Sequence, residues 1–265
     1  MLPGRLVVVL LRDHRAEVFG AEPASAAACA ETRDMILAHL TRVRPEWFER
    51  AGGSVFACLT GEQYDICAHD PLELAGRLVQ EDLCLIEASA EGPRLTAAIL
   101  CFPSRWRLHE KLGRPLSIVH GAVPLYAEKL ARPVDRFMDR VRPDHIAIRI
   151  NWSLMDDPVL FQPTGKWRTD RNETIDANNA GERLFLRVER QSFRRLPVSG
   201  AVLFGIRVHV YPLSRVIATP SLAARLACAV RALPTAMAQY KSLPMFQDAL
   251  LAWLERRAGG PPGEQ

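Results

Sequence analysis

The segment 187–197 places five charged residues directly after a run in which apolar residues alternate with others. Leu184 and Leu186 fall on one side of this period-two pattern, and Arg187 and Glu189 fall on the other. Such alternation is typical of a half-buried β-strand. Because burial of a guanidinium without a partner costs several kcal/mol, we expect the arginines to meet acids, a bound anion or water.

Two further segments, 145–152 and 202–211, show the same alternation. Their polar positions are Arg149, Asn151, Arg207 and His209. If the three strands are neighbours, we expect one face of their sheet to carry a polar band rich in arginine. Two interpretations stay open at this point. The band is either a sheet face in contact with water or a pocket for a ligand that carries carboxylates or phosphates.

Length and composition limit the function classes. With 265 residues and 48% hydrophobic residues, the chain can bury a sizeable core. The net charge of +4 is mild and its two signs are interleaved, which disfavours nucleic-acid binding. The apolar run 6–11 is too short for a membrane span, so we expect a cytoplasmic protein that contacts no membrane. The six cysteines form no CxxC pair and no phosphate-binding glycine loop occurs, which disfavours zinc ribbons, iron–sulfur sites and nucleotide-binding folds.

The order of strand and helix patterns predicts an α+β fold, with one curved antiparallel sheet, inserted and flanking helices, and packing on one side. Residues 55–67 and 83–102 each predict a hairpin, and Asp70 with Pro71 predicts a helix that runs to about Glu81. The expected divisions are an N-terminal layer of strand and helix (1–50), a core (51–215), C-terminal helices that pack on the core (216–258) and a disordered tail (259–265).

His120 is the histidine with the best placement for chemistry. It stands between an apolar stretch and a glycine, and Pro124 follows, which predicts a rigid turn. Spacing alone leaves two roles open, a hydrogen-bonded structural residue and a metal ligand. No HxxxH or HExxH pair is present to hold zinc, whereas haem iron needs only one protein ligand and basic groups for its two propionates.

Glu81 and Asp82 lie between a predicted helix and a buried strand, where the negative end of the helix disfavours a carboxylate. Two explanations stay open: an internal arginine such as Arg149 or Arg190 compensates, or the pair recognises a cationic amine or handles protons. Residues 166–173 are polar without periodicity and predict an exposed loop, suited to a lid or a partner surface.

Six short motifs follow one another in a fixed order. They are Gln80-Glu-Asp-Leu83, Cys101-Phe-Pro103 with Trp106, Glu110-Lys-Leu-Gly113, Val119-His-Gly-Ala-Val-Pro124, Arg149-Ile-Asn-Trp152, and Arg187-Val-Glu-Arg-Gln191 through Arg194-Arg-Leu-Pro197. In this order they resemble the α-subunit family of haem-dependent oxidative N-demethylase over residues 55–215. The first fifty residues, and the Gly-Ala that follows His120, depart from the family pattern, and either departure could accompany a different substrate.

This resemblance implies a PAS-like core that binds haem b. The implied reaction is a monooxygenase-type activation of O2 that demethylates a small secondary amine, such as dimethylamine, and releases formaldehyde. Electrons would come from flavin and ferredoxin-type partner subunits, since the chain has no flavin or iron–sulfur motif of its own.

The resemblance also assigns roles to residues. It implies that His120 is the axial iron ligand, that Arg190 stabilises an iron-bound oxygen anion, and that Asp82 or Glu81 binds the substrate ammonium. The residues expected to hold the haem are Arg149, Asn151, Arg187, Arg194 and Arg195. A haem-binding or gas-sensing module without turnover is the alternative, since a PAS-like fold hosts many functions. A domain that has lost haem and serves as a partner-binding scaffold is a third possibility.

Overall fold

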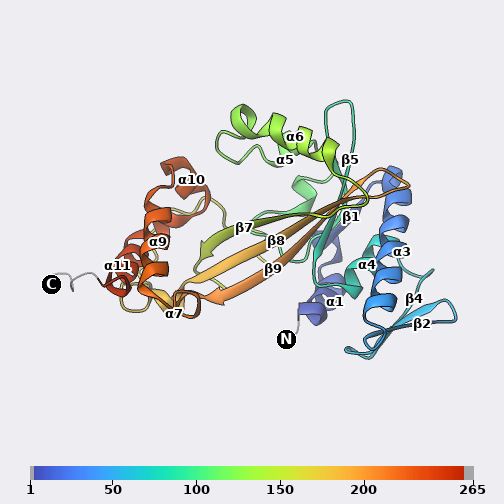
Figure 1. Ribbon diagram of the computed structural model, residues 1–265, viewed down its shortest axis with the longest axis horizontal. Coiled ribbons are helices and arrows are strands. Elements are labelled where there is room, and N and C mark those ends of the chain that lie inside the picture. The colour runs from blue at the N-terminus through green and yellow to red at the C-terminus, as the bar shows by residue number, and fades with distance from the viewer. Residues whose placement is uncertain (1–2, 260–265) are drawn as a thin grey trace.

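The computed structural model describes residues 3–259 and is built around a six-stranded sheet (Figure 1). Every pairing in this sheet is antiparallel, in the order β1-β6-β5-β9-β8-β7. The strands are β1 (Phe19–Ala21), β5 (Asp82–Glu87), β6 (Arg94–Ile99), β7 (Ala147–Met155), β8 (Phe185–Arg195) and β9 (Val202–Pro212). A separate small sheet holds β2 (Phe48–Ala51), β3 (Ser54–Ala57) and β4 (Glu62–Asp65). The α+β class and the antiparallel sheet are therefore confirmed.

Helices lie on both faces of the main sheet, so the expectation of packing on one side is wrong. Three helices cover one face at β5 and β6, through a core that includes Leu83, Leu85 and Leu203. They are α1 (Pro3–Asp13), α3 (Ala26–Val43) and α4 (Pro71–Leu78). The opposite face is met by α5 (Leu116–Val119), a π-helix η3 (Tyr126–Leu130) and α6 (Ala131–Arg140). Phe193 and Val202 of the sheet pack there against Leu116 and Met138.

The C-terminal helices gather at one end of β7, β8 and β9 (Figure 1). They form a core of their own around Leu154, Leu184 and Trp253. Their bounds are α7 (Ala180–Arg183), α8 (Leu213–Val216), α9 (Pro220–Arg231), α10 (Thr235–Tyr240) and α11 (Gln247–Arg257). The remaining short elements are α2 (Arg15–Val18), η1 (Pro23–Ser25), η2 (Leu108–Glu110) and η4 (Leu243–Met245).

Local signals in the sequence located several of these elements. The Asp70 side chain accepts hydrogen bonds from the amides of Leu72 and Glu73, which confirms the predicted cap, although α4 ends at Leu78. The apolar run 6–11 is helical rather than strand-like, because Val7, Leu10 and Leu11 share the buried side of α1. A continuous apolar run of this length does not distinguish the two periods.

The N-terminal fifty residues contribute to the main sheet as well as to its cover. Phe19, Gly20 and Ala21 of β1 pair with β6 at one edge of the sheet. Between residues 3 and 259, no helix has the length and apolar character needed to cross a membrane. Of the tail expected at 259–265, all but the first residue lies outside the described part of the chain.

The register of β7, β8 and β9 sorts their side chains onto two faces. Arg149 lies opposite Gln191, and Asn151 lies opposite Glu189, so these residues share the side that we call the inner face. Arg190 lies between Ile150 of β7 and Arg207 of β9 on the other side, the outer face. The three strands are neighbours, as a shared polar band requires. The expectation that Arg207 and His209 join that band is wrong, because β9 turns Ile206 and Val208 to the inner face.

Candidate functional site

A cavity of about 860 Å³ lies over the inner face. The sheet lines one side of it, the segment from α5 to α6 lines another, and α10 with the residues that follow it closes one end. Much of the wall is apolar and aromatic, with Phe193 stacked on Phe204 at 4.4 Å between ring centroids. Its size and mixed lining are those of a cofactor or small-molecule site.

His120 lies at the C-terminal end of α5 and lines this cavity. Its Nδ1 is 2.9 Å from the carbonyl oxygen of Leu116, and its ring stacks on Tyr126 at 4.8 Å. A carbonyl oxygen only accepts, so Nδ1 carries the hydrogen. Burial lowers the pKa of His120, which keeps the ring neutral and leaves the lone pair on Nε2. This is the state in which a histidine can serve as a single metal ligand.

Five Lys or Arg side chains also line the cavity. Arg105 is ion-paired with Asp156, and the other four are Lys111, Arg149, Lys166 and Lys241. Within residues 3–259, none of the four has an ion-pair partner. The Nζ of Lys111 lies 4.2 Å from the ring centroid of Trp106, and that of Lys241 donates to the carbonyl of Trp152 at 2.9 Å. Burial lowers the pKa of each lysine, that of Lys111 to about 8. Four cations beside one cavity favour an anionic ligand.

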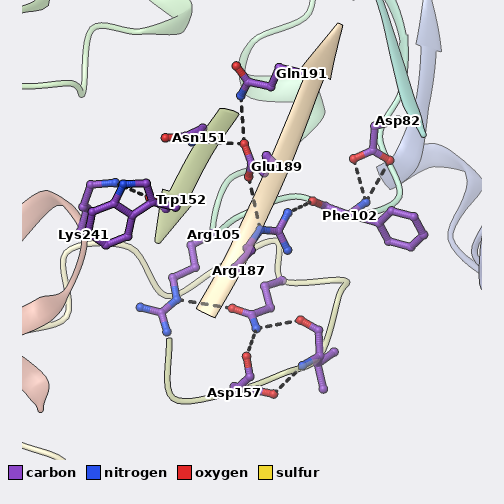
Figure 2. Close-up of polar contacts among 12 residues, drawn as sticks. Asp82, Phe102, Arg105, Asn151, Trp152, Asp157, Arg187, Glu189, Gln191 and Lys241 are labelled. Carbon is purple, nitrogen blue, oxygen red and sulfur yellow. Dashed lines mark hydrogen bonds and ion pairs between the residues drawn. The ribbon is translucent and has the colours of Figure 1, made fainter. Parts of the chain in front are cut away.

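Glu189 is the only carboxylate among the described residues that line the cavity. It accepts hydrogen bonds from Asn151 Nδ2 at 3.2 Å, Gln191 Nε2 at 3.0 Å and Arg187 Nε at 3.3 Å. Figure 2 shows these donors converging on Glu189 from β7 and β8. The carboxylate is thus held in one orientation at the polar end of the inner face.

Arg187 is buried behind Glu189, with 1% of its side chain exposed. Its Nη2 donates to the carbonyl of Phe102 at 2.6 Å, while its Nη1 is buried and finds no partner in the described part of the chain. The guanidinium therefore joins Glu189 to the loop after β6 and does not line the cavity. Its expected contact with a haem propionate is not supported by this position.

Asp82 is buried on β5, where its carboxylate accepts from the amides of Cys101 at 2.7 Å and Phe102 at 3.1 Å. Burial raises the pKa of Asp82 to about 7. Figure 2 shows the chain of contacts from Asp82 through Phe102 to Arg187. The arginine linked to Asp82 is therefore Arg187, through the backbone of Phe102. Arg149 and Arg190, the two arginines expected to offset the charge of Asp82, do not contact it. Neither Asp82 nor Glu81 lines the cavity, so an amine held there would not contact them.

The structure also places three of the predicted arginines away from the cavity. Arg190 is exposed on the outer face and does not line the cavity, so this position does not support its expected contact with bound oxygen. Arg194 donates to the carbonyl of Pro143 at 2.9 Å, and Arg195 donates to the carbonyl of Val141 at 2.8 Å. Both arginines fasten the segment between α6 and β7 to the end of β8, which leaves neither guanidinium for a ligand in the cavity.

A family model matches residues 8–251 of this chain, and it describes the family as haem-dependent oxidative N-demethylase, alpha subunit-like. The match spans far more than half of the sequence. The chain belongs to this family. The resemblance drawn from the six motifs is thereby confirmed, and the match extends beyond 55–215 into both the N-terminal residues and the C-terminal helices.

The family description names haem, and haem iron needs one protein ligand rather than a cluster of metal ligands. No group of three or more His, Cys, Asp or Glu side chains within residues 3–259 could hold a metal ion. His120, Arg149 and Asn151 are the predicted site residues that the fold brings to the cavity together.

Sequence reasoning missed the three cavity lysines. Lys111 stands inside the matching motif 110–113, so the motif itself was a signal. Lys166 belongs to the loop 166–173 that was expected to be exposed, and its side chain turns into the cavity wall. Asp156, which is ion-paired with Arg105, holds this loop near the site. Its Oδ2 lies 3.7 Å from Arg168 Nη1 and accepts from Asn172 Nδ2 at 3.3 Å. Nothing in the local sequence pointed to Lys241.

Proposed function

We propose that this chain binds haem b in the cavity and is the oxygen-activating subunit of an oxidative N-demethylase for a small methylated amine. One observation carries the proposal: a neutral histidine with an unprotonated Nε2 lines the same cavity as four cations without ion-pair partners. Haem requires one such ligand and cations for its propionates. When bound, it would supply the O2 binding and the redox chemistry of the reaction.

The residues at the cavity fit haem, with a set of cations that differs from the predicted one. His120 would be the axial ligand, with its ring orientation fixed by Leu116 and Tyr126. Arg149, Lys111, Lys166 and Lys241 would face the propionates in place of Arg187, Arg194 and Arg195. The stacked Phe193 and Phe204 would supply a flat apolar surface for the macrocycle. Asn151 would act indirectly, since its amide holds Glu189.

Glu189 would bind the amine. A small secondary amine has a pKa near that of lysine, about 10.4, and therefore arrives as a cation. Glu189 is the one carboxylate among the described residues of the cavity wall, so it is the protein group that would attract the ammonium.

The PAS-like description is part of the proposal and is supported by the order of five strands. In the order β6-β5-β9-β8-β7, the hairpin of β5 and β6 lies beside β9, the last strand in the sequence, so β5 and β9 pair in the middle of the sheet. The cavity lies over one face of these strands. Electrons would come from flavin or ferredoxin-type proteins, because no flavin or iron–sulfur motif is present in this sequence.

The test is spectroscopic first and chemical second. Protein purified from haem-replete cells should show a Soret band that shifts with dithionite and then with carbon monoxide. With a chemical reductant and O2, a panel of methylamines should release formaldehyde, and secondary amines should react fastest. Colourless protein that takes up no added hemin would reject the haem site. Bound haem without formaldehyde from any amine would favour the gas-sensing or haem-binding alternative.

The Glu189→Gln variant tests the amine site separately. It keeps the size of the side chain and one acceptor, and it removes the charge. We expect haem content to be retained and KM for the amine to rise about tenfold or more. A matched change on the outer face, Ser192→Ala, should leave KM unchanged. Equal KM values for the wild type and Glu189→Gln would remove Glu189 from the amine site.

A further inference from the structure

The outer face of β7, β8 and β9 is open, cationic and partly apolar. Ile150 on β7 is 56% exposed and Tyr211 on β9 is 46% exposed, while Ile148, which is 54% exposed, also lines the cavity at the edge of the sheet. In the middle row, Ile150, Arg190 and Arg207 lie side by side across the three strands. The charged or titratable residues at outward positions of these strands are Arg190, Arg194, Arg207 and His209, and no carboxylate is among them.

No helix covers this surface in the described part of the chain. The helices α1, α3 and α4 cover the same side of the sheet only at β5 and β6, and the C-terminal helices lie at the end of the strands (Figure 1). Large apolar side chains in a row on an edge strand are unusual at a surface that meets only water. The combination of exposed isoleucine and arginine is typical of a surface that meets another protein.

We propose that the outer face docks an acidic electron-donor protein. This inference rests on the proposed function, and it adds the place where electrons enter. Charge decides the occupant: a second copy would bring the same arginines against one another, since a two-fold contact pairs a surface with itself. An acidic surface would complement Arg190 and Arg207, and its apolar part would cover Ile150 and Tyr211.

The position relative to the cavity also supports this occupant. Arg190 stands between Glu189 and Gln191 on β8, and both of these neighbours line the cavity. A donor on the outer face is therefore separated from the proposed haem by a single sheet. A short path through one strand layer suits electron transfer, and no substrate channel is needed on that side.

The test uses holoprotein and a reduced acidic [2Fe–2S] ferredoxin as the probe, with haem reduction followed by stopped-flow absorbance. In the wild type, the rate should fall as salt is raised, because opposite charges steer the encounter. The double variant Arg190→Glu/Arg207→Glu should be slower by about tenfold or more at low salt. Arg225→Glu on the exposed side of α9 is the matched control and should match the wild type. Reduction by dithionite should be equal in all three proteins.

Several outcomes would overturn this inference. They are a wild-type rate that does not respond to salt, an absence of ferredoxin binding, or an unchanged rate in the double variant. A wild-type dimer that Ile150→Glu dissociates in the ultracentrifuge would instead assign the face to a second copy. Calorimetric binding of oxidised ferredoxin needs no haem, and formaldehyde release with a chemical reductant needs no ferredoxin. Failure of the docking surface and failure of the proposed function are therefore distinguishable.

Discussion

The inner and outer faces of β7, β8 and β9 are built from alternate residues of the same strands, yet their environments are reversed from the usual pattern. On the inner face, Arg187 and Gln191 are buried and hydrogen-bonded. On the outer face, Ile148 and Ile150 are exposed. An antiparallel sheet usually buries its apolar face and leaves its polar face in water. The elements that cover a face therefore decide its role here. The buried polar groups of the inner face and the exposed apolar side chains of the outer face both indicate a surface that binds another molecule.

The reversal has a structural cause. The segment from α5 to α6 crosses the polar face and encloses a cavity with it, so each buried polar group there requires a partner. Glu189 and Arg187 find partners in one another and in the loop after β6, while four cations line the open space. The outer face, which is cationic and partly apolar, has no such cover from the described helices. The inner face is thus suited to a small anionic cofactor, and the outer face is suited to a protein.

The largest expected effect compares the two faces through their histidines. His120→Ala removes the proposed iron ligand and should lower haem affinity by about 100-fold or more. His209→Ala on the outer face should retain haem at the wild-type level. Hemin titration followed at the Soret band measures both, and added imidazole should restore part of the spectrum in His120→Ala. Equal haem affinity in the two variants would reject His120 as the ligand.

The next comparison uses two arginines of β8 that differ only in the face they occupy. Arg187→Ala removes the positive charge and one of the three donors from Glu189, together with the side-chain donor of the Phe102 carbonyl, and it should cost about 3–5 kcal/mol of unfolding free energy. Arg190→Ala should change stability by less than about 0.5 kcal/mol, because the side chain is exposed. Urea unfolding of the haem-free proteins gives both values. A loss below about 1 kcal/mol for Arg187→Ala would show that the network contributes little.

These comparisons also show which parts of the structure the sequence could predict. The alternation in 145–152, 187–195 and 202–211 located three strands, because a period of two is a local property of the chain. Asp70 marked a helix start for the same reason. Local sequence did not show which face of these strands would be buried. The choice of face depends on the packing of α5 and α6 against Phe193 and Val202, and those contacts join residues distant in sequence.

The candidate site was predictable to a similar extent. His120, Arg149 and Asn151 were found because motifs carry them, and they reach the cavity. Arg190 was misplaced because a motif gives residue identity but not orientation, and one position along a strand reverses the face. Lys166 and Lys241 come from a loop and from the end of α10, so only the folded chain brings them beside His120.

Asp82 makes the stability of the fold depend on pH. Burial raises the pKa of Asp82 from the ordinary 3.8 to about 7, so the folded state holds a proton more tightly than the unfolded state does. The resulting stability is complete below about pH 4 and is lost as the pH rises through about 7. Relative to the wild type, Asp82→Asn should therefore gain stability across pH 4–7. Unfolding free energies measured at intervals across this range test it, and a constant difference for Asp82→Asn would contradict it.

The smallest expected effect compares single cations on the two faces. Lys241→Met keeps a long unbranched side chain and removes one charge from the cavity wall, with the loss of the Nζ contact to the Trp152 carbonyl. If that charge faces a propionate, haem affinity should fall by about fivefold to tenfold, as for one charge-assisted contact of about 1–1.5 kcal/mol. Arg207→Met on the outer face removes the same charge from the same protein and should leave haem affinity unchanged, although it should slow reduction by ferredoxin. Because the change in net charge is equal, any difference in hemin titration between the two variants comes from the face that lost the charge. Equal losses of affinity would show that the cavity responds only to the total charge of the protein, and the division of roles between the two faces would then be wrong.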